Sequence, residues 1–148
     1  MKSAYLITEH KETALILEYL LPQTLVQSTE IVAMSTRYSA QSLAGTLMSE
    51  RDRPVALVLN ADTTDKSAIQ EQLSLINTLL LPAANRAPYQ VFLAVPTAAS
   101  LIPQQTESPT LLTEQLAHLS ADQIQSLQQQ PLLQQLTQFL ANACAQAA

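Results

Sequence analysis

Three oxygen-bearing side chains follow directly on two apolar runs of the sequence. An uninterrupted apolar run at residues 55–59 ends at Asn60, and Asp62 follows two positions later. A second run, at residues 4–8, leads straight into Glu9. Side chains two positions apart on an extended backbone point the same way, so Asn60 and Asp62 share a face. Hard divalent cations prefer such oxygens. These residue types therefore predict a weak magnesium site at Glu9, Asn60 and Asp62.

These residues would converge only if their strands end at one edge of a parallel sheet. The run at 55–59 is rich in Val and Leu and follows Pro54, which is typical of a strand buried on both faces. The hydrophobic pattern predicts further strands at 3–8, 30–34 and 90–95, and helices at 12–21, 39–50 and 66–81. Such alternation favours right-handed crossovers and a mainly parallel sheet of about four strands. Ligands of such sheets bind outside the carboxyl ends of the strands.

Helical spacing of apolar residues also predicts which helix faces are buried. We expect Asp62 or Thr64 to cap the helix at 66–81. The residues expected on the inner faces of the three helices are Leu15, Ile16, Tyr19 and Leu20; Leu43, Leu47 and Met48; and Ile69, Leu73, Ile76, Leu79 and Leu80.

Beyond Pro96 the sequence predicts only helices. Ser108 followed by Pro109 is a helix start, and Ser120 with Gln123 is a capping-box pattern. The last predicted helix begins at Pro131, and its apolar stripe consists of Leu132, Leu133, Leu136, Phe139, Leu140 and Ala143. We therefore expect one domain at 1–148, with an α/β core at 3–96 and a helical extension at 97–148 packed on it.

Composition excludes several classes of function. Gly45 is the only glycine, so the glycine-rich loops of Rossmann dinucleotide binding and P-loop hydrolysis and the G-x-S-x-G nucleophile elbow are all missing. Cys144 is the only cysteine, which excludes an internal disulfide framework and a cysteine-based zinc site.

Charge and hydropathy limit the expected partners. The net charge is −5 and all seven Lys and Arg lie in the first 86 residues, so nucleic-acid binding by the isolated chain should be weak. No apolar run approaches the roughly 20 residues that span a bilayer. We expect no membrane association and a bacterial-type cytoplasmic location.

The residues at 5–9 and 55–63, with a helix and a second strand between them, resemble the Toprim domain. This is the metal-binding, three-layer Rossmann-like α/β module of type IA topoisomerases, DnaG-type primases and OLD-family nucleases. Its pattern is a glutamate after the first strand and an aspartate-x-aspartate motif after the third. The resemblance covers about residues 3–96. It implies that Glu9 is the glutamate used in proton transfer and that Asp62 is the second aspartate, both near magnesium.

The sequence departs from that pattern in ways that bear on activity. Asn60 stands in place of the first aspartate and carries no charge, and His10 replaces the glycine that usually follows the glutamate. No acidic residue follows the strand at 90–95, although Asp65 could partly compensate. These departures favour a non-catalytic or attenuated module that acts with a protein partner or as a homo-oligomer. The alternative is a magnesium-dependent nuclease or nucleotidyl-transfer enzyme with Glu9 as base or ligand.

Structural roles for the same residues remain open. Asp62 would serve equally as a helix cap, and Glu9 would be favoured by the dipole of the helix that follows it. Lys11 and Arg37 lie near strand ends, where they could meet a phosphate or act as solubilising charges. We expect both histidines, His10 and His118, at the surface. Receiver-like and flavodoxin-like sheets also place acidic residues at strand ends, so these architectures remain alternatives.

Overall fold

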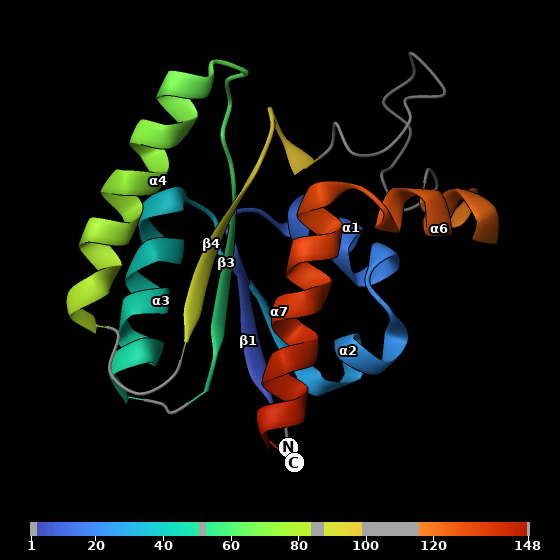
Figure 1. Cartoon of the computed structure of the whole chain (residues 1–148), viewed down its shortest axis with the longest axis horizontal. Helices are drawn as coiled ribbons and strands as arrows, with labels where there is room; N and C mark the ends of the chain where they lie inside the picture. The colour runs from blue at the N-terminus through green and yellow to red at the C-terminus, as the bar shows by residue number, and fades with distance from the viewer. Residues whose placement is uncertain (1–2, 51–52, 84–87, 99–115, 148) are drawn as a thin grey trace.

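The computed structural model describes residues 3–50, 53–83, 88–98 and 116–147 (Figure 1). Its elements are β1 (Ala4–Thr8), α1 (Lys11–Leu20), α2 (Gln23–Ser28), β2 (Thr29–Ala33), α3 (Arg37–Glu50), β3 (Val55–Asn60), α4 (Lys66–Leu80), η1 (Leu81–Ala83), β4 (Tyr89–Ala94), α6 (Ala121–Gln128) and α7 (Pro131–Ala147). The predicted alternation of strand and helix is confirmed, with ends shifted by one or two residues. The helix start predicted at 108–109 lies outside the described residues.

The four strands form one sheet in the order β2-β1-β3-β4, and all pairings are parallel. The predicted α/β class with a mainly parallel sheet is therefore confirmed. The connection from β1 leads to β2 at one edge of the sheet, and the connection from β3 leads to β4 at the opposite edge. Such a reversal opens a crevice outside the carboxyl ends of the two central strands. Glu9 and Asn60 lie there, at the ends of β1 and β3.

Helices cover both faces of the sheet, giving three layers (Figure 1). Alternate residues of each strand point to opposite faces, which explains why every residue of β1 is buried. On one face α3 and α4 bury Ala40, Ala44, Met48, Ile76 and Leu80 against Tyr5, Ile7, Val55, Leu57, Leu59 and Val91. On the other face α1, α2, α6 and α7 bury Ile16, Leu17, Leu20, Leu25, Leu127, Leu133, Leu136, Leu140 and Ala143 against Ala4, Leu6, Ala56, Val58, Phe92 and Ala94.

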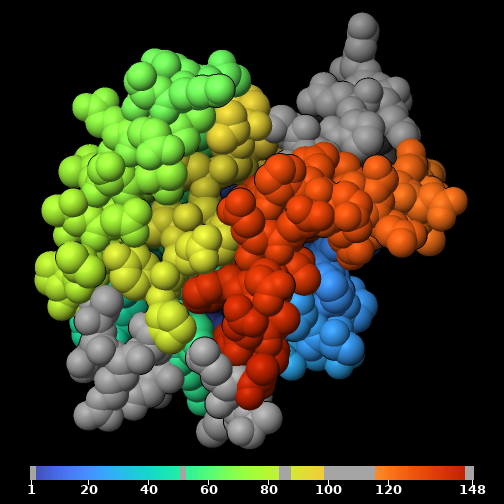
Figure 2. Space-filling view, in the orientation of Figure 1, coloured from blue at the N-terminus to red at the C-terminus, as the bar shows by residue number. Residues whose placement is uncertain are grey.

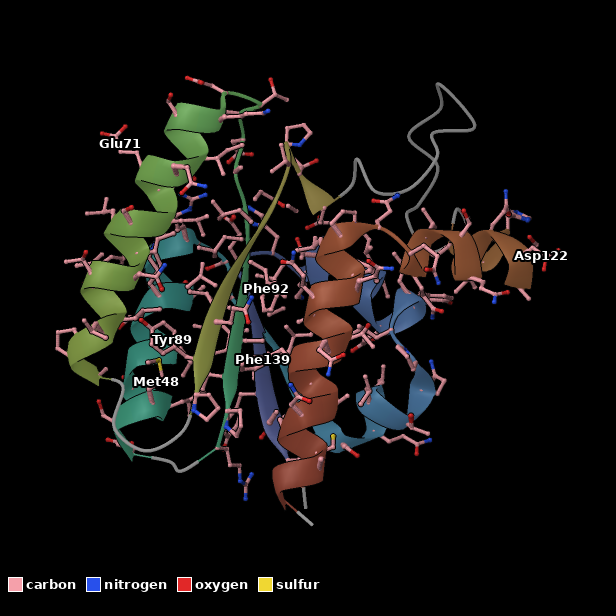
Figure 3. All side chains as sticks on the ribbon, in the orientation of Figure 1. Met48, Glu71, Tyr89, Phe92, Asp122 and Phe139 are labelled. Carbon is pink, nitrogen blue, oxygen red and sulfur yellow. The ribbon has the colours of Figure 1, made fainter. Side chains whose placement is uncertain are left out.

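Of the C-terminal helices, α7 packs on the sheet as predicted, and α6 packs against α1 and α7. Phe92 of β4 meets Phe139 of α7 edge to face, with ring centroids 6.1 Å apart (Figure 3). The capping box at Ser120 and Gln123 is present, and the last helix begins at Pro131. Leu132 and Phe139 of the predicted stripe are partly buried, and its other four members are buried. None of the helices that the structure describes is long and apolar enough to cross a membrane.

Some predictions of local structure were wrong. Helix α2, which is six residues long and buries only Leu25, was not predicted. Leu79 is 58% exposed because α4 rests on the sheet through Ile76 and Leu80, and Leu79 lies to one side of that contact. Tyr19 is likewise 37% exposed.

The predicted cap of α4 was also wrong. The helix is capped by Asp65, whose Oδ1 accepts the N–H of Ser67 at 3.1 Å. Thr63 Oγ1 accepts the N–H of Asp65 at 3.1 Å, so the chain makes a further turn before the helix begins. Asp62 and Thr64 consequently lie too early in the chain to cap α4.

Candidate functional site

Glu9 is held in place by the short turn between β1 and α1. Thr8 is fully buried, and its Oγ1 donates a hydrogen bond of 2.9 Å to the carbonyl of His10. The carbonyl of Thr8 accepts the N–H of Met34 at 2.9 Å, so β1 stays paired up to its last residue. This turn leaves Glu9 only 5% exposed, although glutamate side chains are normally exposed to solvent. A carboxylate buried at this position needs partners.

The partners of Glu9 come from the neighbouring strand and from its own turn. Glu9 Oε1 accepts the backbone N–H of Asn60 at 2.6 Å. Glu9 Oε2 lies 3.5 Å from Nε2 of His10, whose side chain is 45% exposed and therefore reaches solvent, as expected. The carboxylate thus bridges the carboxyl ends of β1 and β3. The predicted convergence of Glu9 and Asn60 is present in the structure.

Asn60 in turn holds the segment that follows β4. Its Oδ1 accepts the backbone N–H of Ala98 at 2.8 Å. The loop after β3 continues the pairing, since the N–H of Ala61 donates to the carbonyl of Ala94 at 2.9 Å and that of Asp62 donates to the carbonyl of Pro96 at 2.7 Å. The side-chain oxygen of Asn60 therefore serves as a clamp between two loops.

Asp62 adopts a left-handed backbone conformation with φ of 59° and an exposed side chain. Asp and Asn tolerate this region better than most residues other than glycine. The hydrogen bond from the N–H of Asp62 to Pro96 fixes the turn. The residue type at this position thus has a conformational explanation that requires no ligand.

Arg37 and Gln72 complete the cluster from the helices on one face. Arg37 Nη1 donates to Gln72 Oε1 at 2.9 Å, and Nη2 donates to the carbonyl of Asn60. Gln72 Nε2 donates to the carbonyl of Ala61 at 3.0 Å. Arg37 was expected near a strand end, whereas Gln72 was not predicted, because a glutamine in an amphipathic helix gives no signal. Together they anchor α3 and α4 to the end of β3.

Hydrogen-bond donors already engage two of the three predicted magnesium ligands. Glu9 Oε1 and Asn60 Oδ1 each direct a lone pair at a backbone N–H. Within the described part of the chain, no group of three or more His, Cys, Asp and Glu residues could hold a metal ion. This donor set fits a structural clamp better than a dedicated cation site, so we derive no catalytic step through a metal. Magnesium binding stays a prediction.

A shallow depression of about 450 Å³ lies beside this cluster, at the carboxyl ends of β1 and β2. His10 and Lys11 line it together with Ser35. Lys11 is exposed. His118, the other histidine, is exposed at the surface as expected.

Comparisons of the chain with protein-family models, with curated proteins and with solved structures found no match. The resemblance to the Toprim domain therefore rests on the residues that follow β1 and β3. Membership of that family stays a prediction.

The conformation of Asp62 leads to a testable difference between two substitutions. Asp62→Gly should leave the free energy of unfolding unchanged or raised, because glycine adopts positive φ without steric cost. Asp62→Ala should lower it by about 1 kcal/mol, since the alanine Cβ crowds the backbone in the left-handed region. Urea unfolding followed by circular dichroism measures both. Equal losses in the two variants would show that the carboxylate itself is what stabilises the fold.

Proposed function

We propose that this chain is a Toprim-like module that binds or assembles with a partner and has lost or attenuated the phosphodiester chemistry of that family. One observation carries the proposal. The two predicted site residues that lie together, Glu9 and Asn60, use their side-chain oxygens to hold backbone N–H groups of Asn60 and Ala98. Glu9 Oε1 and Asn60 Oδ1 maintain the shape of the sheet edge in this way, while Glu9 Oε2 lies 3.5 Å from Nε2 of His10.

Charge supports an assembly role over an independent nucleic-acid enzyme. The chain has a net charge of −5 and no basic residue after Arg86. A protein that neutralises phosphates needs clustered Lys and Arg. A partner protein would therefore have to supply the basic surface if this module acts on nucleic acid.

A metal titration of thermal stability tests the proposal. A ligand that binds only the folded state raises the free energy of unfolding, by about 2.7 kcal/mol at a free ligand concentration of 100 Kd, and the melting temperature rises with it. We expect the wild-type chain to show at most a small rise in melting temperature with magnesium or manganese, because the predicted site is weak. Without metal, Asn60→Asp should have a lower melting temperature than the wild type. The new carboxylate would lie close to that of Glu9, and the repulsion between them should lower the free energy of unfolding by about 1 kcal/mol.

Two further variants serve as comparisons in the same titration. Asp122→Asn removes an exposed carboxylate on α6, outside the predicted ligands, and should behave like wild type. Asp62→Gly removes the predicted ligand while keeping the backbone conformation. A large metal-dependent rise in the wild type that Asp62→Gly abolishes would overturn the non-catalytic proposal, whereas a rise gained only by Asn60→Asp would agree with a site weakened by the loss of that aspartate.

The alternative function is magnesium-dependent phosphodiester cleavage or nucleotidyl transfer, and one observation favours it. The guanidinium of Arg37 lies at the carboxyl end of β3, where it bonds only neutral oxygens of Gln72 and Asn60. Among the described residues no carboxylate forms an ion pair with it. A cation held there beside Glu9 would suit a phosphate. Under this alternative, nuclease activity on single- or double-stranded DNA would be lost in both Glu9→Gln and Arg37→Gln.

A further inference from the structure

The β4 strand forms one edge of the sheet that the structure describes. Within the described residues β4 pairs only with β3. The carbonyls of Pro88 and Ala94, six positions apart, accept the N–H groups of Val55 and Ala61. Backbone groups alternate in direction along a strand, so the even positions of β4 face β3. The N–H and C=O groups of Tyr89, Val91 and Leu93 therefore point outward.

A groove of about 350 Å³ runs along this edge between α4 and α7. None of the described residues that line it is charged; they include Ile69 and Leu73 of α4, Val91 and Leu93 of β4, and Leu132 and Gln135 of α7. Figure 2 shows β4, in yellow, open at the surface between α4 and α7. An extended chain laid in this groove would meet backbone groups at its base and apolar side chains on both sides.

The β4 edge lacks the features that usually protect a sheet edge from pairing. Proteins blunt free edges with charged side chains, proline or bulges. The six residues of β4 include no charge, proline or glycine, and their pairing with β3 runs without interruption. The other edge strand, β2, carries the exposed Glu30. The two edges thus differ, and only β4 is suited to strand addition.

We propose that the β4 edge pairs antiparallel with β4 of a second copy of this chain, joining the two sheets across a two-fold axis. The proposal rests on the assembly role proposed above and names its partner. An uncharged groove favours an uncharged occupant, and β4 is itself such a strand. In a two-fold pair each copy donates and accepts the same hydrogen bonds, so the outward groups of both are satisfied together.

The charges at the two ends of β4 also favour the antiparallel arrangement. Tyr89 lies beside Val55, so the backbone of Arg53 lies two residues before the amino end of this edge, with its guanidinium 5.8 Å from the ring centre of Tyr5 on β1. Ala94 lies beside Asn60, and the residues after Asn60 leave one excess negative charge, from Asp62, Asp65 and Lys66. Antiparallel pairing sets the amino end of each copy against the carboxyl end of the other. Parallel pairing would instead set like charges together.

Light scattering over a concentration series tests the proposal on the full chain. The wild type should approach twice the chain mass of 16.1 kDa as the concentration rises. Val91→Pro removes an outward N–H but no bond to β3, so it should raise the dimer Kd roughly tenfold or more. Ile31→Pro is the matched control on the other edge strand, β2. The N–H of Met34 bonds to the carbonyl of Thr8, so the backbone groups at even positions face β1 and the N–H of Ile31 points outward. Ile31→Pro should leave the dimer Kd unchanged.

A second pair of variants avoids changes to the strands. Gln135→Glu places a charge in the groove of each copy, whereas Gln138→Glu adds the same charge outside this groove. Both residues are exposed on α7, so both variants should fold. Only Gln135→Glu should weaken the dimer.

Amide hydrogen exchange locates the interface. The N–H groups of Val91 and Leu93 should exchange more slowly as the concentration rises, whereas those of Gln90 and Phe92 are protected by β3 at every concentration. A monomer at all concentrations, or a dimer that ignores both Val91→Pro and Gln135→Glu, would overturn the proposal. Either result would leave the non-catalytic role standing, because the metal titration tests that role separately.

Discussion

Replacing Glu9 by alanine is expected to lower the free energy of unfolding by about 2–3 kcal/mol. The variant would leave the N–H of Asn60 without its acceptor in a partly buried hydrogen bond, since Glu9 Oε1 lies 2.6 Å from that nitrogen. The effect should be large because an unsatisfied buried donor loses its hydrogen bond to water as well as to the protein. Urea unfolding followed by far-UV circular dichroism measures the change.

Glu9→Gln is the matched control for that experiment. Glutamine keeps an oxygen of the same reach to accept the N–H of Asn60 but carries no charge. If Glu9 is a structural clamp, Glu9→Gln should fall within about 1 kcal/mol of wild type, because a neutral acceptor also avoids the cost of burying a carboxylate. A loss as large as that of Glu9→Ala would mean that the negative charge itself holds the fold, contrary to the clamp interpretation.

Leu136→Ala is expected to lower the free energy of unfolding by about 3 kcal/mol. Leu136 lies on α7, is fully buried, and belongs to the same core as Leu6 of β1 and Leu17 of α1. Deleting three buried carbons leaves a cavity that the surrounding helices and strands fill only in part. Thermal unfolding followed by calorimetry and near-UV absorbance measures the loss.

The same variant tests whether the C-terminal helices and the α/β core form one domain. If they do, Leu136→Ala should lower a single cooperative transition, and far-UV and tyrosine signals should coincide. Gln138→Ala, on the exposed side of α7, should change stability by less than about 0.5 kcal/mol. Two separate transitions in wild type, with only one moved by Leu136→Ala, would show that α7 unfolds independently of the sheet.

Local patterns in the sequence were enough to predict the α/β class and most elements. The run at 55–59 predicted a strand buried on both faces, because it offers no polar residue to a solvated side, and the structure confirms it. Ser120 and Gln123 cap α6 through hydrogen bonds within four residues, which depend on no distant part of the chain. The convergence of Glu9 and Asn60 also followed from the sequence, since parallel strands present their carboxyl ends at one edge.

Only the tertiary structure decided what these residues do there. The oxygens of Glu9 and Asn60 are bound by N–H groups of Asn60 and Ala98, and the latter is 38 residues away from Asn60. The link from Arg37 to Gln72 spans 35 residues. The order of the strands and the open edge of β4 likewise depend on which elements pack side by side. Residue type and spacing determine interactions between neighbours along the chain. A hydrogen bond between distant loops depends instead on which segments the folded chain brings together.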